Sequence, residues 1–179
     1  MRFCSACGAE VVRAIPAGDD RDRDVCPGCG VVHYVNPKIV VGSVCSWGER
    51  LLICRRAIEP RAGFWTIPAG YLELGETAEE GAVREAWEEA RARIRIEGVL
   101  AVYSVPRIGQ VQILFRAELL DAAVAAGPES LEVALVGWHE IPWSELAFPT
   151  VEWVLRRAGD LRRVPGPLVT VGNPGAPDR

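Results

Sequence analysis

The segment that most restricts the fold of this chain spans residues 70–92 and reads GYLELGETAEEGAVREAWEEARA. Thr77 precedes Glu80 at the spacing of a capping box, so a helix is expected to begin near Ala78. At 3.6-residue spacing its apolar side should comprise Ala82, Val83, Ala86, Trp87 and Ala90. The carboxylates that would share the opposite side are Glu85, Glu88 and Glu89.

An acidic helix face has two interpretations. It is usually solvated and paired with nearby arginines, which here are Arg84, Arg91 and Arg93. The loop before this helix favours a metal site instead, because Gly70 and Gly75 stand where a tight loop needs positive φ or close backbone approach. Clustered carboxylate oxygens suit a hard divalent cation such as Mg²⁺ or Mn²⁺.

The same segment resembles the Nudix box, which is Gly, five residues, Glu, seven residues, Arg-Glu, an aliphatic residue, any residue, Glu-Glu, any residue, Gly and an aliphatic residue. Every fixed position matches except the last Gly, where this chain has Arg91. Arg in the left-handed conformation would cost about 1 kcal/mol, unless the helix continues by one residue. The resemblance implies an α/β fold, the α/β/α Nudix sandwich with a mixed sheet, and hydrolysis of a diphosphate linked to a nucleoside or similar group.

The resemblance also implies roles for residues in and around the box. Glu85 and Glu89 would be the principal ligands of Mg²⁺ or Mn²⁺, with Glu88 assisting and the Ala69 carbonyl as a further ligand. Arg84 would orient these carboxylates through salt bridges. Related enzymes also bring in a distant Glu as ligand or base, for which we expect Glu132, with Glu129 as its rival.

Substrate contacts are expected from two kinds of side chain. Arginines and amides would bind phosphate and polar groups, and aromatic rings would stack on adenine or flavin, although such rings are more often part of a core. The candidates are Tyr34, Arg55, Phe64, Trp65, Arg107 and Gln110.

Ahead of the box, two CxxCG knuckles are separated by eighteen residues. Thiolates at this spacing form a structural tetrahedral Zn²⁺ site with no open position for catalysis. Two disulfides are the alternative, which we reject because the first cysteine stands too early for a signal peptide to precede it. The expected zinc ligands are Cys4, Cys7, Cys26 and Cys29, whereas Cys45 and Cys54 are expected to be ordinary buried thiols.

The pattern along the chain predicts a zinc ribbon over residues 1–36, a Nudix domain over residues 37–158 and a partly disordered tail over residues 159–179. Strands are expected over residues 38–46, 51–56, 94–105, 111–119 and 133–138, with a closing helix over residues 150–157. A net charge of −4 makes nucleic acid an unlikely partner, and no apolar run is long enough to span a membrane. We expect a cytoplasmic protein, and because related enzymes often dimerise a homodimer is a further expectation.

Two subfamilies of the Nudix family combine some of these features. A ribbon before the box and His33-Tyr34 resemble NADH pyrophosphatase, but its Ser-Gln-Pro-Trp-Pro-Phe-Pro signature is replaced here by SVPRIGQVQ. The segments FWTIPAGYLELGE, IGQ, GPESLE and EIPW are more similar to the plant-type FAD and ADP-ribose pyrophosphatase. The expected substrate is therefore FAD or ADP-ribose. The alternatives are NADH or NAD-capped RNA, and a Nudix-like nucleotide sensor without catalysis.

Overall fold

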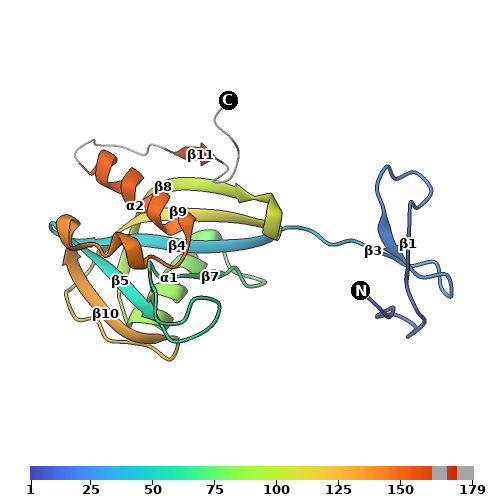
Figure 1. The fold of residues 1–179 in the computed structure, drawn as a ribbon, viewed down its shortest axis with the longest axis horizontal. Helices are drawn as coiled ribbons and strands as arrows, with labels where there is room; N and C mark the ends of the chain where they lie inside the picture. Colours follow the sequence, from blue (N-terminus) through green and yellow to red (C-terminus); the bar gives the residue numbers. More distant parts are fainter. Residues whose placement is uncertain (163–168, 173–179) are drawn as a thin grey trace. The chain divides into compact units, whose positions relative to one another are not determined.

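The computed structural model describes residues 1–162 and 169–172, and the chain divides into two compact units, Met1–Pro37 and Lys38–Arg179 (Figure 1). In the first unit, short strands form an antiparallel sheet in the order β1-β2-β3. These strands are β1 (Val12–Ala14), β2 (Arg23–Val25) and β3 (Val32–His33).

The second unit is built on a mixed sheet in the order β10-β5-β4-β9-β8-β11. Parallel pairs join β4 to β9 and β11 to β8, and the other neighbours are antiparallel. The strands are β4 (Lys38–Trp47), β5 (Arg50–Arg56), β8 (Ile94–Val105), β9 (Gln110–Leu119), β10 (Ser130–Gly137) and β11 (Thr170–Gly172).

Strands β4 and β5 are separated over most of their length. β4 and β5 pair only beside their turn, at Ser46↔Leu51 and Trp47↔Arg50. Further along, β5 pairs with β6 (Trp65–Thr66) and β4 pairs with β7 (Ala69–Tyr71), so the connecting segment enters between the two strands. The hairpin is therefore held closed at one end and separated at the other.

The two helices cover opposite faces of the sheet (Figure 1). Alternating strand residues divide between them, since Val44 and Leu51 pack with α2 (Pro149–Leu161) whereas Cys45 and Leu52 pack with α1 (Ala78–Ala90). The expected layered fold with a mixed sheet is confirmed. The described part of this unit also contains single-turn 3₁₀ helices, η1 (Pro106–Ile108), η2 (Trp138–Glu140) and η3 (Trp143–Glu145).

Helix α1 begins where the capping box predicts. The Thr77 hydroxyl accepts a hydrogen bond from the Glu80 N–H at 3.2 Å, and the Glu80 carboxylate accepts one from the Thr77 N–H at 2.7 Å. The prediction of its two faces is partly wrong, because Val83 and Trp87 are exposed. The buried side of α1 consists of Gly81, Ala82, Glu85, Ala86, Glu89 and Ala90.

Arg91 itself takes the left-handed conformation, with φ 51° and ψ 23°. The helix therefore ends at Ala90 and does not run on, which decides between the two expectations for this departure from the box. Its N–H donates to the Trp87 carbonyl at 2.9 Å, and its guanidinium carbon lies 5.7 Å from the centre of the Trp87 ring. Arg91 thus caps the helix as a Gly would, but with the steric cost of a side chain.

The closing helix predicted over residues 150–157 is longer than expected. Helix α2 starts at Pro149, a good first helical residue, and extends to Leu161. Thr170–Gly172 form strand β11, which pairs with β8. Residues 163–168 and 173–179 lie outside the described part of the chain, so a partly disordered tail over residues 159–179 stays a prediction. Among the described residues, no helix combines the length and apolar character needed to cross a membrane.

Arg91→Gly should raise the free energy of unfolding by about 1 kcal/mol, because glycine adopts this backbone conformation without the clash that Arg91 bears. Arg91→Ala is the matched control, since it removes the contact with Trp87 but keeps a Cβ. Urea unfolding of the three proteins measures both changes. A gain for alanine as large as that for glycine would show that the backbone conformation is not the cause.

Candidate active site and metal centre

Helix α1, strand β7 and the separated ends of the strands enclose a cavity of about 870 Å³. Its acidic wall is made of carboxylates from α1 and from the loop before β10, and the opposite parts are apolar, aromatic or basic. The polar lining residues are Arg56, Glu59, Thr66, Tyr71, Glu73, Arg84, Glu85, Glu88, Glu89, Arg107, Gln110, Gln112, Glu129 and Thr150.

Arg84 connects the acidic residues of the box. Its guanidinium donates to both carboxylate oxygens of Glu76, at 2.8 and 3.0 Å, and to Glu85 and Glu88 at 2.6 and 3.0 Å. It also donates to the Tyr71 carbonyl at 2.9 Å, which ties α1 to strand β7. These charge-assisted bonds fix where the carboxylates of Glu85 and Glu88 point, and they hold the pKa of Glu76 down at about 2.

Glu85 and Glu89 are both buried, and they lie on the cavity side of α1. Burial raises the pKa of Glu89 to about 8, and the neighbouring Glu85 carboxylate adds to the rise. Burial also raises the pKa of Glu85, although Arg84 opposes it. Glu89 accepts a hydrogen bond from the Ala69 N–H at 3.3 Å. A cation bound between these groups would relieve the cost of two buried negative charges.

Gly70 is required by the approach of Glu85. A Cβ at Gly70 would overlap the Glu85 carboxylate group. Strand β7 and helix α1 therefore come closer at this point than any other residue type permits. The sequence-based reason for this glycine, close backbone approach, is the one that the structure shows.

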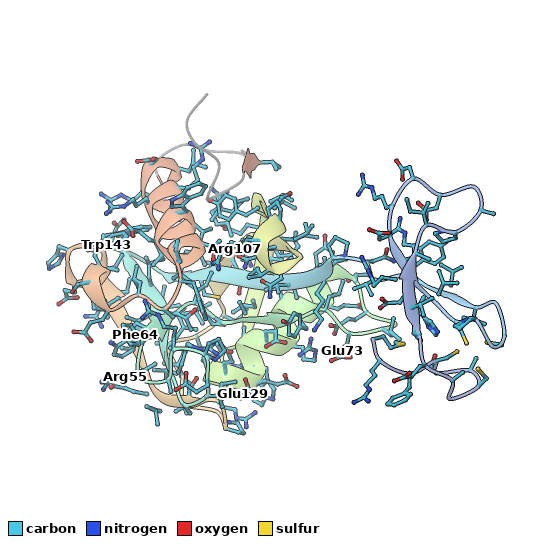
Figure 2. All side chains as sticks on the ribbon, turned by 45° about the vertical axis from the view of Figure 1, so that its right-hand side comes forward. Arg55, Phe64, Glu73, Arg107, Glu129 and Trp143 are labelled. Atoms are coloured by element: carbon cyan, nitrogen blue, oxygen red, sulfur yellow. The ribbon has the colours of Figure 1, made fainter. Side chains whose placement is uncertain are left out.

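The distant carboxylate inside the cavity is Glu129 and not the preferred candidate Glu132. Glu129 lines the cavity beside α1 (Figure 2), and its charge raises the pKa of both Glu85 and Glu89. Glu132 lies outside the cavity and pairs with Arg55 at 3.8 Å. The pairing of β10 with β5 has a register shift between Ser130 and Glu132. Residue spacing in the sequence therefore could not predict which of the two glutamates lines the cavity.

The structure divides the expected substrate contacts into two groups. Arg107 and Gln110 line the cavity, whereas Arg55 and Trp65 lie outside its lining. Arg55 instead donates to the Gly63 carbonyl at 2.9 Å. Trp65 packs against the core under α2, and Phe64 lies under the guanidinium of Arg61.

Tyr34 belongs to the first unit, so its role in binding substrate stays a prediction. Its exposed ring lies 5.1 Å from the guanidinium carbon of Arg23.

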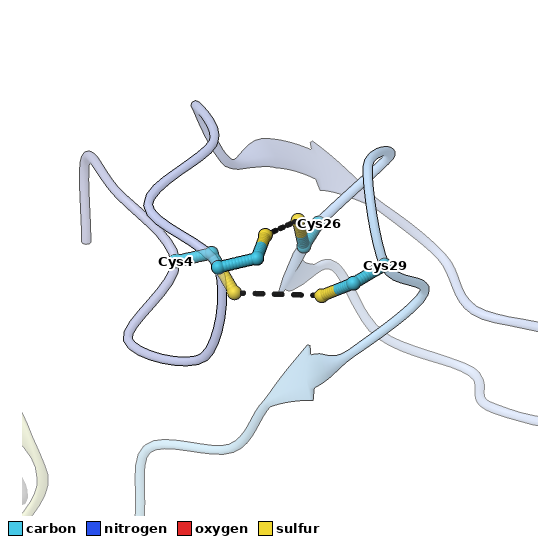
Figure 3. Close-up of side chains that lie close together, drawn as sticks. Cys4, Cys26 and Cys29 are labelled. Carbon is cyan, nitrogen blue, oxygen red and sulfur yellow. Dashed lines mark hydrogen bonds between the residues drawn. The ribbon is translucent and has the colours of Figure 1, made fainter.

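In that first unit the sulfur atoms of Cys4, Cys7, Cys26 and Cys29 converge (Figure 3) and all lie within 4.8 Å of one another. All four cysteines are free thiols, which is the arrangement of a closed tetrahedral metal site. His33 Nε2 lies 3.3 Å from the Cys4 sulfur, a contact that the sequence pattern did not predict. The cluster fits the structural zinc site that the cysteine spacing predicts.

Residues 37–156 match the NUDIX domain family, and residues 2–35 match the Nudix N-terminal zinc-ribbon family. The chain belongs to the Nudix family. As a Nudix hydrolase it is a pyrophosphatase whose chemistry implies a divalent metal ion.

This Nudix hydrolase is similar to three proteins of particular interest. An ADP-ribose pyrophosphatase of Methanocaldococcus jannaschii is 29% identical over 119 residues, covering 64% of this chain and 69% of that protein. The NAD-capped RNA hydrolase NudC of Stutzerimonas stutzeri is 31% identical over 137 residues, covering 74% of this chain and 46% of that protein. The chain thus spans about half the length of the NudC relatives.

The third is the crystal structure of a NUDIX hydrolase from Nitrosomonas europaea. It is 48% identical, with a TM-score of 0.92, and the match covers 97% of this chain and 98% of that one. The agreement extends over the ribbon as well as the Nudix domain.

The donor set of the cavity fits a hard divalent cation. Glu85, Glu88, Glu89 and Glu129 supply carboxylate oxygens, and Ala69 also lines the cavity. In the described part of the chain, however, only the four cysteines bring their ligand atoms within 4.8 Å of one another. The box carboxylates are less convergent because Arg84 draws Glu85 and Glu88 toward itself.

Several cavity residues of this Nudix hydrolase were not predicted from the sequence. Arg56 donates to the Pro60 carbonyl at 2.9 Å, and its guanidinium carbon lies 5.2 Å from the centre of the Phe148 ring. Tyr71 and Gln112 also line the cavity. The alternation of side chains along a strand could have predicted Gln112 as a cavity residue from Gln110, since the two residues share one face of β9.

Gly70→Ala should lower the free energy of unfolding by about 1–3 kcal/mol, because the added methyl group overlaps the Glu85 carboxylate. The same change in a Glu85→Ala background should cost much less, since the overlapping group is gone. Urea unfolding of the four proteins completes this cycle. Equal costs in both backgrounds would place the constraint elsewhere in β7.

Cys26→Ser should release the zinc of the ribbon, because three thiolates and a hydroxyl do not complete the site. Metal analysis of the purified protein should fall from about one zinc per chain to well below that value. Cys45→Ser is the matched control, since Cys45 is buried in the core of the Nudix domain and is not one of the four cysteines of the cluster. Zinc retained by Cys26→Ser, or lost equally from Cys45→Ser, would refute the assignment.

Proposed function

We propose that this Nudix hydrolase cleaves the diphosphate bond of FAD, giving FMN and AMP, or of ADP-ribose, giving ribose 5-phosphate and AMP. One observation carries the proposal. The four glutamates Glu85, Glu88, Glu89 and Glu129 line the same cavity as basic, aromatic and amide side chains. Such a cavity has room for groups on both sides of a diphosphate, and its volume is within the usual range for small-molecule sites.

The residues of the acidic wall and Arg84 would each have a separate role in binding the cation that acts on the diphosphate. Glu85 and Glu89 would hold the divalent cation, Mg²⁺ or Mn²⁺, with help from Glu88 and the Ala69 carbonyl. When bound, this ion supplies neutralisation of the diphosphate charge and activation of water. Arg84 would keep the carboxylates in place through the ion pairs it already makes.

Glu129 is the group we propose as the base. It approaches from a different element than the box, and its carboxylate lines the cavity without a salt bridge to any described residue. A carboxylate in this position would accept the proton of the attacking water as the oxygen bonds to phosphorus, and the other phosphate would leave. Glu132 would have no part in this step, since it pairs with Arg55 outside the cavity.

The similar proteins support two substrate groups. The relative from Methanocaldococcus jannaschii is an ADP-ribose pyrophosphatase, which favours the first proposal. The NudC relatives are NAD-capped RNA hydrolases, so NADH or an NAD cap is the second candidate. Against it stands SVPRIGQVQ, which forms the end of β8, the turn η1 and the start of β9 where that subfamily carries its signature.

A non-catalytic sensor is the candidate from another functional class. Sensor relatives tend to lose the carboxylates of the box, and this chain keeps Glu76, Glu85, Glu88 and Glu89. The ion pairs of Arg84 with Glu76, Glu85 and Glu88 support retention of an ion-binding function. Catalysis is therefore the stronger proposal.

Product release from FAD, ADP-ribose, NADH and NAD⁺, each with Mg²⁺ or Mn²⁺, tests the proposal. FAD or ADP-ribose should have the highest kcat/KM, and Glu89→Gln should abolish turnover. Glu129→Gln should lower kcat by about 100-fold if it is the base. Glu132→Gln is the matched control, because Glu132 lies three residues further along, on β10 and outside the cavity, and this variant should stay within about twofold of the wild type.

The outcomes separate the candidates. Preference for NADH would replace the proposed substrates by the second candidate. Loss of activity in Glu132→Gln with normal Glu129→Gln would restore the sequence-based choice of the distant glutamate. No turnover on any substrate, with ligand binding unchanged by Glu85→Gln, would favour the sensor.

A further inference from the structure

Three polar side chains form a hydrogen-bonded row along one wall of the cavity. Gln112 Nε2 donates to Gln110 Oε1 at 3.2 Å, and Gln110 Nε2 donates to the Tyr71 hydroxyl oxygen, also at 3.2 Å. All three residues line the cavity, together with Arg107 from the turn before β9. Neither the box nor the proposed hydrolytic step uses this row.

Strand register brings the members of the row together. Val40 of β4 pairs with Tyr71 of β7 on one side and with Gln112 of β9 on the other. Gln110 and Gln112 stand two residues apart on β9 and share a face.

Two further contacts immobilise Tyr71. Its carbonyl accepts a hydrogen bond from Arg84 at 2.9 Å, and the Lys38 ammonium lies 5.1 Å from the centre of its ring. The row is thus linked directly to the arginine that orients the box carboxylates.

Each end of the row keeps hydrogen-bonding capacity. Among the described residues, Gln112 Oε1 accepts no hydrogen bond and the Tyr71 hydroxyl donates none. The row therefore offers an acceptor and a donor on one wall, and none of its members carries a charge. Its complement is an uncharged ligand that donates a hydrogen bond at the Gln112 end and accepts one at the Tyr71 end.

Arg107 adds a charge beside this row. Within the described part of the chain no ion pair or hydrogen bond engages its side chain, although it lines the cavity (Figure 2). A guanidinium without a protein carboxylate suits a phosphate. The four residues together fit a phosphate ester that carries a neutral polar group.

We propose that Tyr71, Gln110, Gln112 and Arg107 form the subsite for one half of the substrate and set its KM. This inference rests on the proposed diphosphate hydrolysis. Arg107 binds the phosphate of that half, and the row binds its neutral end. Two sources have this chemistry, the amino-pyrimidine edge of adenine in AMP and the hydroxyl groups of ribose 5-phosphate.

The other half of the substrate lies across strand β4. β5 is the neighbour of β4 on one side and β9 on the other, so Arg56 and the two glutamines of the row come from opposite sides of β4. Arg56 with Phe148 offers a cation and a ring, in contrast to the neutral row. The two sides therefore differ in chemistry, which gives the substrate one orientation.

Kinetics on the preferred substrate test the subsite through Gln112→Met and Tyr71→Phe, which keep side-chain size but remove hydrogen bonds. Each should raise KM about three- to tenfold and leave kcat within about twofold. The double variant should raise KM less than the product of the single effects, because the bonds form one row. Glu118→Gln, on the same strand outside the cavity, should match the wild type.

Calorimetric titration with AMP and, separately, ribose 5-phosphate identifies the source without turnover. Binding of one of them should weaken about three- to tenfold in Gln112→Met and stay unchanged in Glu118→Gln. The compound that loses affinity is the half held by the row. If neither binds the wild type, or both bind Gln112→Met as they bind the wild type, the subsite is refuted.

These two experiments also separate this inference from the proposed function. Absence of turnover by the wild type would refute the hydrolysis, while the titrations would still decide whether the row binds a phosphate ester. Normal turnover with KM unchanged in all variants would refute the subsite alone. A fall in kcat without a change in KM would likewise refute it, because it would assign the row to the chemical step.

Discussion

The rest of the site depends on the hydrogen bonds and ion pairs that the guanidinium of Arg84 makes. It holds Glu76 from the loop, Glu85 and Glu88 from the helix, and the carbonyl of Tyr71 from the strand. One side chain therefore fixes the relative positions of three elements. Without it, Glu76, Glu85 and Glu88 would lose their shared cation, and strand β7 would keep only the hydrogen bond from the Ala69 N–H to Glu89 as a hydrogen-bonded link to the helix.

The separation of strands β4 and β5 makes room for the cavity that the Arg84 network borders. Because the hairpin is paired only near its turn, the segment that carries β6 and β7 enters between the strands and places Gly70 against Glu85. The same insertion leaves β5 and β9 on opposite sides of β4. A single topological feature thus produces both the acidic centre and the two chemically different sides of the site.

Much of this could be predicted from local sequence, and the exceptions have physical causes. The capping box and the cysteine knuckles are short-range patterns, so the start of α1 and the ribbon cluster were correct. The predicted faces of α1 were partly wrong. Hydrophobicity alone placed Trp87 in the core, whereas Trp87 is exposed and Glu85, which pairs with Arg84, is buried. Glu129 and Tyr71 depend on strand register and a bulge, which no local pattern reveals.

The loop before β10 is attached to the end of helix α1. The N–H groups of Ala125 and Gly127 donate to the Ala90 and Glu89 carbonyls at 2.9 Å, and a Cβ at Gly127 would overlap the Glu88 carbonyl. These bonds satisfy carbonyls that a helix end leaves free. Over evolutionary time, insertions and deletions in this loop are therefore expected only upstream of Ala125, since any change in length beyond it would move Glu129 away from the helix.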